Sequence, residues 1–512
     1  ITDPEELTLQ TPESFFKRFR INMKIHHEVI SIHPERKTVS VKNLENGEIF
    51  EENYDKLILS PGAKPTQPRL PGVGMDKLFT LRTVEDTFRI KEYINKNHPK
   101  SAVLAGGGFI GLELAENLRE LGMDVTIVQR PKQLMNPFDP DMASMIHNEM
   151  RKHGIKLVLG YTVEGFKEKD NGVEVLLKDN PSLQADMVVL AIGVTPDTAL
   201  AKEAGLELGI KGSIVVNDRM ETSVPDIYAA GDAVQVKHYV TGDDALISLA
   251  GPANKQGRII ADNICGGDSR YLGSQGSSVI KVFDITAATT GINETNAKKS
   301  GLEVDTVILS PMSHAGYYPG GKVMTMKVVF EKETYRLLGA QIIGYEGVDK
   351  RIDVLATAIH AGLKATQLKD LDLAYAPPYS SAKDPVNMAG FMIDNIAKGT
   401  LKQWHLEDMD KISKDKSVVL LDVRTVGEFN RGHMDGFKNI PVDELRERIN
   451  EIEKGKPVYL ICQSGLRSYI ASRILEGNGY ETYNFSGGFR FYDVVVNDRV
   501  LIERSYVCGM DY

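Results

Sequence analysis

The sequence predicts an α/β protein of about three domains, and three observations lead to this prediction. The 512 residues are more than a single hydrophobic core usually holds. Residues 101–130 show a buried strand, a glycine-rich turn, a helix and a second strand, which is the pattern of a βαβ unit. Val458–Ile461 is another buried strand, and it leads through a short loop into a helical pattern, as expected for a further α/β domain.

The composition excludes several classes of protein. Hydrophobic residues make up 42% of the chain and charged residues 26%, with a formal charge of −9, which argues against a general nucleic-acid or membrane surface. No apolar run approaches the length of a membrane span. The three cysteines, Cys265, Cys462 and Cys508, are too few for a disulfide framework, so we expect a reducing compartment, the cytoplasm.

The chain is expected to open with a capped helix and an antiparallel hairpin. Thr11 is the N-cap candidate, with Pro12 as the first helical residue. Alternating apolar residues predict strands at His26–Ile32 and Thr38–Lys42. The first residue is Ile1 rather than Met, in a stretch typical of a domain interior, so we expect part of the first domain to precede it.

The stretch 101–130 contains the clearest binding motif. Its first strand ends at three consecutive glycines, and Gly106, Gly108 and Gly111 form G-x-G-x-x-G at the start of the helix. The first glycine permits a tight turn, the second lets the backbone approach a pyrophosphate, and the third lets helix and strand pack closely. Because unpaired N–H groups at a helix N-terminus favour an anion, we expect a dinucleotide phosphate there.

The end of the second strand, Val125–Val128, leaves the choice between NADH and NADPH open. An acidic residue usually follows such a strand and binds the ribose 2′-OH of NAD. This chain has Gln129 and then Arg130. The amide can accept a hydrogen bond from a ribose hydroxyl, whereas the arginine can pair with a 2′-phosphate.

The middle of the chain predicts a third, α+β unit. Before it, the apolar strand in Thr222–Val234 leads into Gly231 and Asp232, a pair that from spacing alone is more often a simple turn. Thr400–Asp410 has the character of a linker. Strands are expected at 278–282, 287–291, 304–309, 322–330 and 337–343, and helices at 348–361 and 384–396.

Cys462 is the most informative cysteine, because it begins a strand-to-helix loop. Amides of this loop, the helix N-terminus and Arg467 would stabilise its thiolate. Phosphate-binding cysteine loops resemble C-x5-R, whereas Cys462 and Arg467 have the shorter spacing C-x4-R, which fits a persulfide or thiosulfate better than a phosphate ester. The alternative is an inert cysteine at the end of a buried strand.

The C-terminal segment resembles a single-domain rhodanese. The resemblance covers residues 411–495 and rests on LDVR at Leu421–Arg424, on Glu428 and on GHMDGFKNIP at Gly432–Pro441, together with the cysteine loop. It implies that Cys462 is the residue that becomes a persulfide.

Residues 1–400 resemble the flavoprotein pyridine-nucleotide disulfide reductases. The similarity is to the group that contains coenzyme A-disulfide reductases, NADH oxidases and NADH peroxidases. Its motifs are YDKLILSPGA at Tyr54–Ala63, TSVPDIYAAGDAV at Thr222–Val234 and LAGPANKQGRIIADNI at Leu249–Ile264. The first motif departs from the group, because Ser-Pro replaces Ala-Thr in its A-T-G-type strand.

This resemblance implies FAD and NADH or NADPH as cofactors. It implies that Asp232 hydrogen-bonds the ribityl chain of FAD, that Phe109 covers the nicotinamide pocket and that Glu113 is the carboxylate beside it. The cofactor-binding residues expected on these grounds are Gly106, Gly108, Phe109, Gly111, Glu113, Gln129, Arg130, Gly193, Gly231, Asp232 and Ala250.

Two tyrosine motifs resemble coenzyme A-disulfide and persulfide reductases within this group. They are SHAGYYPGGK at Ser313–Lys322 and LAYAPPYSSAKDPVNMAG at Leu373–Gly390, and their best-matching tyrosines are Tyr317 and Tyr375. The resemblance implies a homodimer in which these tyrosines reach the active cysteine of the other subunit, where a hydroxyl can steady a leaving thiolate. The alternative for each is a half-buried aromatic residue at a domain interface.

The resemblance also implies parts that the sequence lacks. The family begins with a G-x-G-x-x-G for the ADP part of FAD and a redox cysteine on the following helix, which we expect ahead of Ile1. The implied fold is α/β, with two Rossmann-like FAD- and NAD(P)-binding domains, an α+β dimerisation domain and a C-terminal rhodanese α/β domain. We expect FAD binding by 1–80 and 215–272, NAD(P) binding by 81–214, dimerisation by 273–400, a linker at 401–410 and the rhodanese domain at 411–512.

The expected function is FAD-dependent, NAD(P)H-driven reduction of coenzyme A persulfides or polysulfides, with Cys462 and Arg467 handling sulfane sulfur. Alternatives are a coenzyme A-disulfide reductase, an NADH oxidase or peroxidase, and a redox sensor or sulfur-relay protein. We expect a small thiol persulfide or disulfide as the substrate, no nucleic-acid or membrane partner and no metal. Cys508 either resolves a persulfide on Cys462 or is incidental, and we expect it to be incidental because chain termini are usually mobile.

Overall fold

The computed structural model describes residues 9–169 and 172–507, which fall into two compact units. The first contains residues up to 64 together with 194–238 and 242–274, and the second contains 65–193, 239–241 and 275 onward. Within the described ranges, no helix combines the length and the apolar character needed to cross a membrane. Cys508 lies outside the described residues.

The first unit confirms the predicted capped helix and hairpin. The Thr11 hydroxyl accepts a hydrogen bond from the Ser14 N–H, and Pro12 is the first helical residue. An antiparallel sheet follows, and a short parallel pair elsewhere in the unit brings the strand before Gly231 beside Leu57–Leu59 in the middle of YDKLILSPGA. The elements are α1 (Pro12–Phe19), β1 (His27–His33), β2 (Thr38–Asn43), β3 (Ile49–Asn53), β4 (Leu57–Leu59), α5 (Ala199–Glu203), β15 (Ile227–Ala229), η4 (Gly231–Ala233) and α6 (Ala250–Ile264).

The second unit begins with a five-stranded parallel sheet in the order β6-β13-β7-β8-β9. The βαβ unit predicted for 101–130 forms its centre. Its strands read as continuous apolar runs because both faces of a parallel sheet are covered. The elements are β6 (Leu78–Thr80), α2 (Val84–Asn97), β7 (Ser101–Ala105), α3 (Phe109–Glu120), β8 (Asp124–Gln129), α4 (Pro140–Lys152), β9 (Lys156–Leu159) and β13 (Met187–Leu190), beside an antiparallel sheet of β10 (Val163–Lys169), β11 (Gly172–Leu177) and β12 (Asn180–Ala185).

The α+β part of this unit is a five-stranded antiparallel sheet in the order β18-β19-β22-β21-β20. All five strands were predicted, and the bounds of β18 and β20 agree residue for residue. The elements are β18 (Ser278–Val282), β19 (Ile285–Gly291), α7 (Glu294–Lys299), β20 (Val304–Leu309), β21 (Met324–Glu331), β22 (Leu337–Gly344), α8 (Val348–His360) and α9 (Pro385–Ala397).

The last part of the chain is a parallel sheet in the order β23-β27-β26-β24-β25. Its edge strand β23 lies in the segment predicted to be a linker. Trp404 in β23 is 2% exposed, and its ring packs against Phe437 and Phe485, so burial of this aromatic side chain fixes the segment to the sheet. The elements are β23 (Gln403–Trp404), α10 (Met409–Ile412), β24 (Val419–Asp422), α11 (Val426–Arg431), β25 (Lys438–Asn439), β26 (Val458–Ile461), α12 (Leu466–Glu476), β27 (Thr482–Phe485) and α13 (Gly488–Val507).

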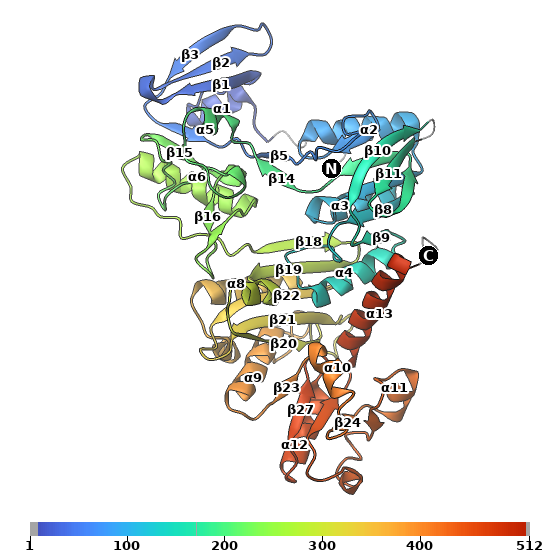
Figure 1. The fold of residues 1–512 in the computed structure, drawn as a ribbon. Helices are drawn as coiled ribbons and strands as arrows, with labels where there is room; N and C mark the ends of the chain where they lie inside the picture. The colour runs from blue at the N-terminus through green and yellow to red at the C-terminus, as the bar shows by residue number, and fades with distance from the viewer. Residues whose placement is uncertain (1–8, 170–171, 508–512) are drawn as a thin grey trace. The chain divides into compact units, whose positions relative to one another are not determined.

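Helix α13 leaves this last sheet and packs along α4 of the nucleotide-binding sheet (Figure 1). Asp498 of α13 is buried, and its two carboxylate oxygens contact His147 Nδ1 at 2.8 Å and an Arg151 guanidinium nitrogen at 2.5 Å. The Nε2 atom of His147 accepts a hydrogen bond from the Leu134 N–H at 2.9 Å. The C-terminal helix is therefore part of the second unit's core and not an appendage.

Candidate functional site

The predicted dinucleotide loop has the geometry that its three glycines require. Gly106 has φ +121°, and a Cβ there would lie 2.2 Å from the Ala191 carbonyl oxygen. A Cβ on Gly111 would lie 2.2 Å from the Gly106 oxygen, so α3 can approach β7 only with glycine at this position. At Gly108, by contrast, a Cβ would meet no atom within 4 Å, and no side chain caps α3 there. The described residues thus leave space and unpaired N–H groups at the helix N-terminus, which fits a pyrophosphate.

The other predicted nucleotide residues lie around this loop. The Gln129 side-chain oxygen accepts a hydrogen bond from the Gly107 N–H at 3.1 Å, and Arg130 is exposed. Phe109 is half-buried in the first turn of α3. Glu113 lies one turn further along, and its pKa is raised by burial and by the nearby Glu116 carboxylate. Gly193 has φ +114° and open space at its Cβ position.

The predicted flavin residues lie together in the first unit. The strand β15 ends at Ala229. Gly231, the first residue of η4, has φ +80°, and its N–H donates to the Gln256 side-chain oxygen of α6 at 2.7 Å. Asp232 follows in η4, and Ala250 is the first residue of α6. The turn and the helix that the resemblance assigns to FAD are thus adjacent through Gln256, which the sequence analysis did not single out. The flavin contacts of Asp232 and Ala250 remain predictions.

Cys462 lies where β26 meets α12 and is 1% exposed. Its sulfur accepts hydrogen bonds from the Gly465 N–H at 3.1 Å and the Ser468 hydroxyl at 3.2 Å. Gly465 has φ +98°, which turns its N–H toward the sulfur at the start of α12. Two donors on one sulfur, at a helix N-terminus, stabilise a thiolate or a terminal persulfide.

Helix α13 also holds the loop that begins at Cys462, through hydrogen bonds to the loop's backbone. The Phe489 N–H donates to the Cys462 carbonyl oxygen at 2.8 Å, and the Arg490 N–H donates to the Gln463 carbonyl at 3.2 Å. A Cβ on Gly488 would lie 2.7 Å from that same Gln463 oxygen. The pair Gly487-Gly488 therefore lets the last helix begin directly against the cysteine loop.

The structure pairs Arg467 with a carboxylate that the sequence analysis did not assign to it. Its guanidinium forms two parallel contacts of 2.7 Å with the Glu428 carboxylate of α11, which holds the pKa of Glu428 at about 2. The pKa of Arg467 is raised, first by Glu428 and also by the neighbouring Cys462. Arg467 thus interacts electrostatically with Cys462, but its charge is already balanced by Glu428. Sequence reasoning noted Glu428 only as a motif residue and did not assign it this partner.

Replacing Glu428 by glutamine is expected to make Cys462 react faster at low pH. The substitution removes the negative charge while leaving an amide that can hold the guanidinium, so the Arg467 charge acts on the sulfur uncompensated. We expect the rate of iodoacetamide alkylation of Cys462, profiled between about pH 5 and pH 8, to rise several-fold at its acid end. The matched control, Glu444→Gln, removes an exposed carboxylate that pairs with Arg448 and should leave the profile unchanged. An unchanged profile in Glu428→Gln would show that Arg467 does not act on the sulfur.

Tyr317 and Tyr375, the two tyrosines that the resemblance singled out, lie next to each other. Their hydroxyl oxygens are 2.7 Å apart, although 58 residues separate them in the sequence. In the single chain, Tyr317 is 76% exposed and Tyr375 is 46% exposed. The hydrogen bond from Tyr317 raises the pKa of Tyr375. Beside Tyr375 lies a cavity of about 520 Å³, lined by Ser313, His314, Glu346, Gly347, Lys350, Arg351, Ala374, Ala376, Pro378 and Tyr379.

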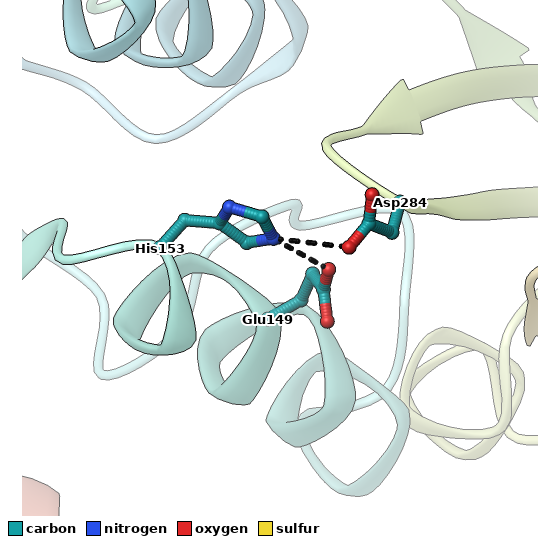
Figure 2. A group of neighbouring side chains, drawn as sticks. All are labelled: Glu149, His153 and Asp284. Atoms are coloured by element: carbon teal, nitrogen blue, oxygen red, sulfur yellow. Dashed lines mark hydrogen bonds and ion pairs between the residues drawn. The ribbon is translucent and has the colours of Figure 1, made fainter.

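A second cluster of polar side chains, Glu149, His153 and Asp284, joins the end of α4 to the turn between β18 and β19. Figure 2 shows that both carboxylates approach the Nε2 atom of His153, at 3.0 Å and 3.4 Å. Such residues can bind a metal, but the Lys152 ammonium lies 3.4 Å from Glu149 and 3.3 Å from Asp284. Since a lysine already supplies the cation, we interpret the cluster as an ion-pair network between the two elements.

The comparisons with known proteins agree with this geometry. Residues 4–257 match the pyridine nucleotide-disulphide oxidoreductase family, 277–385 match its dimerisation domain, and 405–492 match the rhodanese-like domain. The coenzyme A disulfide reductase of Staphylococcus aureus strain JH9 is 37% identical over 393 residues, which cover 76% of this chain and 87% of that protein.

Two solved structures are similar over nearly the whole chain. The reduced Bacillus anthracis CoADR-RHD has a TM-score of 0.95 and 46% identity, and the match covers 98% of this chain and 89% of the other. The NAD-dependent persulfide reductase from A. fulgidus has a TM-score of 0.89 and 37% identity, with coverage of 96% and 90%.

Proposed function

The chain belongs to the pyridine nucleotide-disulphide oxidoreductase family, with a dimerisation domain and a C-terminal rhodanese-like domain, and from this premise we propose that it is a persulfide reductase. It reduces the S–S bond of coenzyme A persulfides or polysulfides with electrons from NADH or NADPH. The observation that carries this proposal is the Cys462 sulfur, held by two hydrogen-bond donors in the same chain as a dinucleotide loop. A sulfur-carrying cysteine has no role in plain disulfide reduction.

The nucleotide-binding sheet positions the electron donor. The N-terminus of α3 and the open space at Gly108 fit the pyrophosphate, and Phe109 and Glu113 lie in the first turns of the same helix. In this family FAD, when bound, supplies two-electron transfer between the nicotinamide and a thiol–disulfide pair. The residues present in the first unit that would hold it are Gly231, Asp232 and Ala250, which the contact between α6 and η4 keeps together. The overall reaction consumes NAD(P)H, one proton and R–S–SH, and yields NAD(P)⁺, R–SH and H₂S.

The rhodanese part supplies a separate thiol exchange. The Cys462 thiolate attacks the terminal sulfur of R–S–SH, a new S–S bond forms on Cys462, and the old S–S bond breaks to release R–S⁻. The Gly465 N–H and the Ser468 hydroxyl stabilise the charge on the attacking sulfur before the exchange and on the persulfide after it. The reverse exchange returns the sulfur to an acceptor thiol. Cys462 therefore stores sulfane sulfur without any net oxidation or reduction.

Further parts of the proposal concern assembly and location. We propose a homodimer, supported by the dimerisation domain and by the exposure of Tyr317 and Tyr375, whose paired hydroxyls are available to a second subunit. We also propose a cytoplasmic location without nucleic-acid or membrane partners, supported by the charge of −9 and the free cysteines Cys265 and Cys462.

Anaerobic turnover tests the proposed function. NADH or NADPH oxidation by the full-length protein is followed with coenzyme A persulfide and with coenzyme A disulfide in parallel, and released sulfide is measured. We expect the persulfide to be turned over faster, with one sulfide formed per NAD(P)H. Faster turnover of the disulfide would identify a coenzyme A-disulfide reductase, and NAD(P)H consumption that requires oxygen or peroxide would identify an oxidase or peroxidase.

A further inference from the structure

We propose that Asn484 is a positioning residue for Cys462, because it directs the hydroxyl proton of Ser468 to the cysteine sulfur. The inference deepens the proposed function and rests on it, since in that function the Cys462 thiolate attacks a sulfane sulfur. Asn484 is 4% exposed and lies on β27, opposite Leu460 of the neighbouring strand β26. Both Asn484 and Cys462 contact the N-terminal end of α12.

The Ser468 hydroxyl has two acceptors within reach but only one proton to donate. Its oxygen lies 3.2 Å from the Cys462 sulfur and 3.1 Å from the Gly465 carbonyl oxygen. A serine on a helix often donates to the carbonyl three or four residues before it, and Gly465 stands three residues before Ser468. While this carbonyl can still accept, it therefore competes with the sulfur for the proton.

Asn484 completes the hydrogen bonding of that carbonyl. A carbonyl oxygen has two lone pairs. The Tyr469 N–H donates to the Gly465 oxygen at 3.1 Å as the first hydrogen bond of α12, and the Asn484 NH₂ group donates to it at 3.2 Å. Both lone pairs are then used, so the sulfur is the acceptor that remains for the Ser468 proton.

The other end of the Asn484 amide separates this role from packing. Its Oδ1 atom is buried, and no described residue donates a hydrogen bond to it. Turning the amide over would place Oδ1 against the Gly465 carbonyl oxygen, so the NH₂ group keeps its position. A buried acceptor without a donor lowers stability. Leucine has nearly the same size and would avoid this cost, so what the amide contributes is its hydrogen bond to Gly465.

Substitution of Asn484 by an apolar residue changes hydrogen bonding at the loop without changing charge. The hydrogen bond of its side chain goes to Gly465 and to none of the charged residues next to the loop. These are the ion pairs Arg467–Glu428 and Arg424–Asp422 and the exposed Arg490 at the start of α13.

Iodoacetamide alkylation of Cys462 in the full-length protein tests the proposal. The alkylated peptide is measured by mass spectrometry between about pH 5 and pH 9. Asn484→Leu leaves the Gly465 carbonyl free to take the Ser468 proton, and a thiolate with one donor fewer is less stable. We expect the alkylation rate to fall about 3- to 10-fold at the acid end. The rates should agree at the alkaline end, where the thiol is ionised in both proteins.

Three further variants separate the hydrogen bond from packing. Asn484→Ala also lacks the donor but leaves space, so it should give the same loss as Asn484→Leu. In a Ser468→Ala background, which lacks the hydroxyl, neither substitution of Asn484 should lower the rate further. The matched control is Asn478→Leu, which removes an exposed amide that donates to the Ile474 carbonyl at 2.8 Å at the other end of α12, and it should leave the profile unchanged.

An unchanged profile in Asn484→Leu would overturn the proposal. A loss in only one of the two Asn484 variants would identify a packing effect and would overturn it as well. An equal further loss in the Ser468→Ala background would show that Asn484 acts without Ser468, which is the third contradicting result. Alkylation needs neither a persulfide nor NAD(P)H, so these outcomes do not depend on whether the proposed sulfur-transfer reaction is observed.

Discussion

Replacing Lys327 by methionine is expected to lower the free energy of unfolding by about 3–5 kcal/mol. Lys327 of β21 is 1% exposed, and its ammonium lies 2.7 Å from Asp141, 2.7 Å from Glu294 and 3.2 Å from Asp139. These carboxylates come from the N-terminus of α4 and from α7, so one buried cation joins the nucleotide-binding part of the second unit to its antiparallel sheet. Without it, three carboxylates remain near each other with little water. Urea denaturation of the two proteins measures the loss.

The same substitution should change how stability depends on pH. Burial alone would raise the pKa of Asp139 and of Glu294, but Lys327 and neighbouring hydrogen bonds lower both below their usual values. Carboxyl groups with a lowered pKa stabilise the wild type above their unfolded pKa values near 4, and this contribution is lost as the pH falls through the folded values. In Lys327→Met their pKa values rise, so the deficit should be largest at neutral pH and shrink toward acid pH as these groups protonate.

Lys298→Met is the matched control for this prediction. Lys298 contacts the same Glu294 carboxylate, but its side chain is 51% exposed, so its loss should cost less than about 1 kcal/mol. If both variants lost the same stability, burial of the Lys327 cluster would not be the cause.

Prediction from the sequence succeeded where the signal is local. Strands β18 and β20 were predicted residue for residue because each is a short run rich in β-branched residues. Helix α4 was not predicted, since its buried face mixes the apolar residues Met142, Ile146 and Met150 with polar ones, Ser144, His147 and Glu149, which weaken the periodic signal. Trp404 was assigned to a linker because a two-residue strand has no periodicity, and only its ring contacts in the folded domain reveal its place.

At the candidate sites, too, the sequence predicted local motifs but not the contacts between residues that are distant in the sequence. The three glycines and Cys462 were found because each motif is contained within about one βα turn, whose geometry constrains the residue types. The residues that contact these motifs, and so change their charge or hydrogen bonding, are distant from them in the sequence. Glu428 lies 39 residues from Arg467 and balances its charge, and Gln129 lies 22 residues from Gly107 and holds its N–H. Such pairings arise from the packing of strands and helices, so no local sequence pattern predicts them.

Replacing Cys462 by serine is expected to reduce sulfane-sulfur transfer from a persulfide donor to cyanide by about 1,000-fold or more. A serine hydroxyl is not ionised near neutral pH and cannot carry a stable sulfane sulfur. The Gly465 N–H and the Ser468 hydroxyl would remain as donors, so the loss would measure the sulfur itself and not the loop. Thiocyanate formation gives the rate, and mass spectrometry of the intact protein shows whether a single sulfur atom is gained.

The same variant separates the two halves of the proposed reaction. NAD(P)H-driven reduction of coenzyme A disulfide should be unchanged in Cys462→Ser, because that reaction has no step in which a sulfane sulfur is stored. Cys265→Ser is the matched control: this cysteine is free and exposed at the end of α6, and its loss should affect neither reaction. A variant that still gains sulfur at full rate would place the sulfur carrier elsewhere. A variant that loses both reactions would show that the rhodanese part is needed for reduction itself, as a domain packed through α13 against the nucleotide-binding sheet makes physically possible.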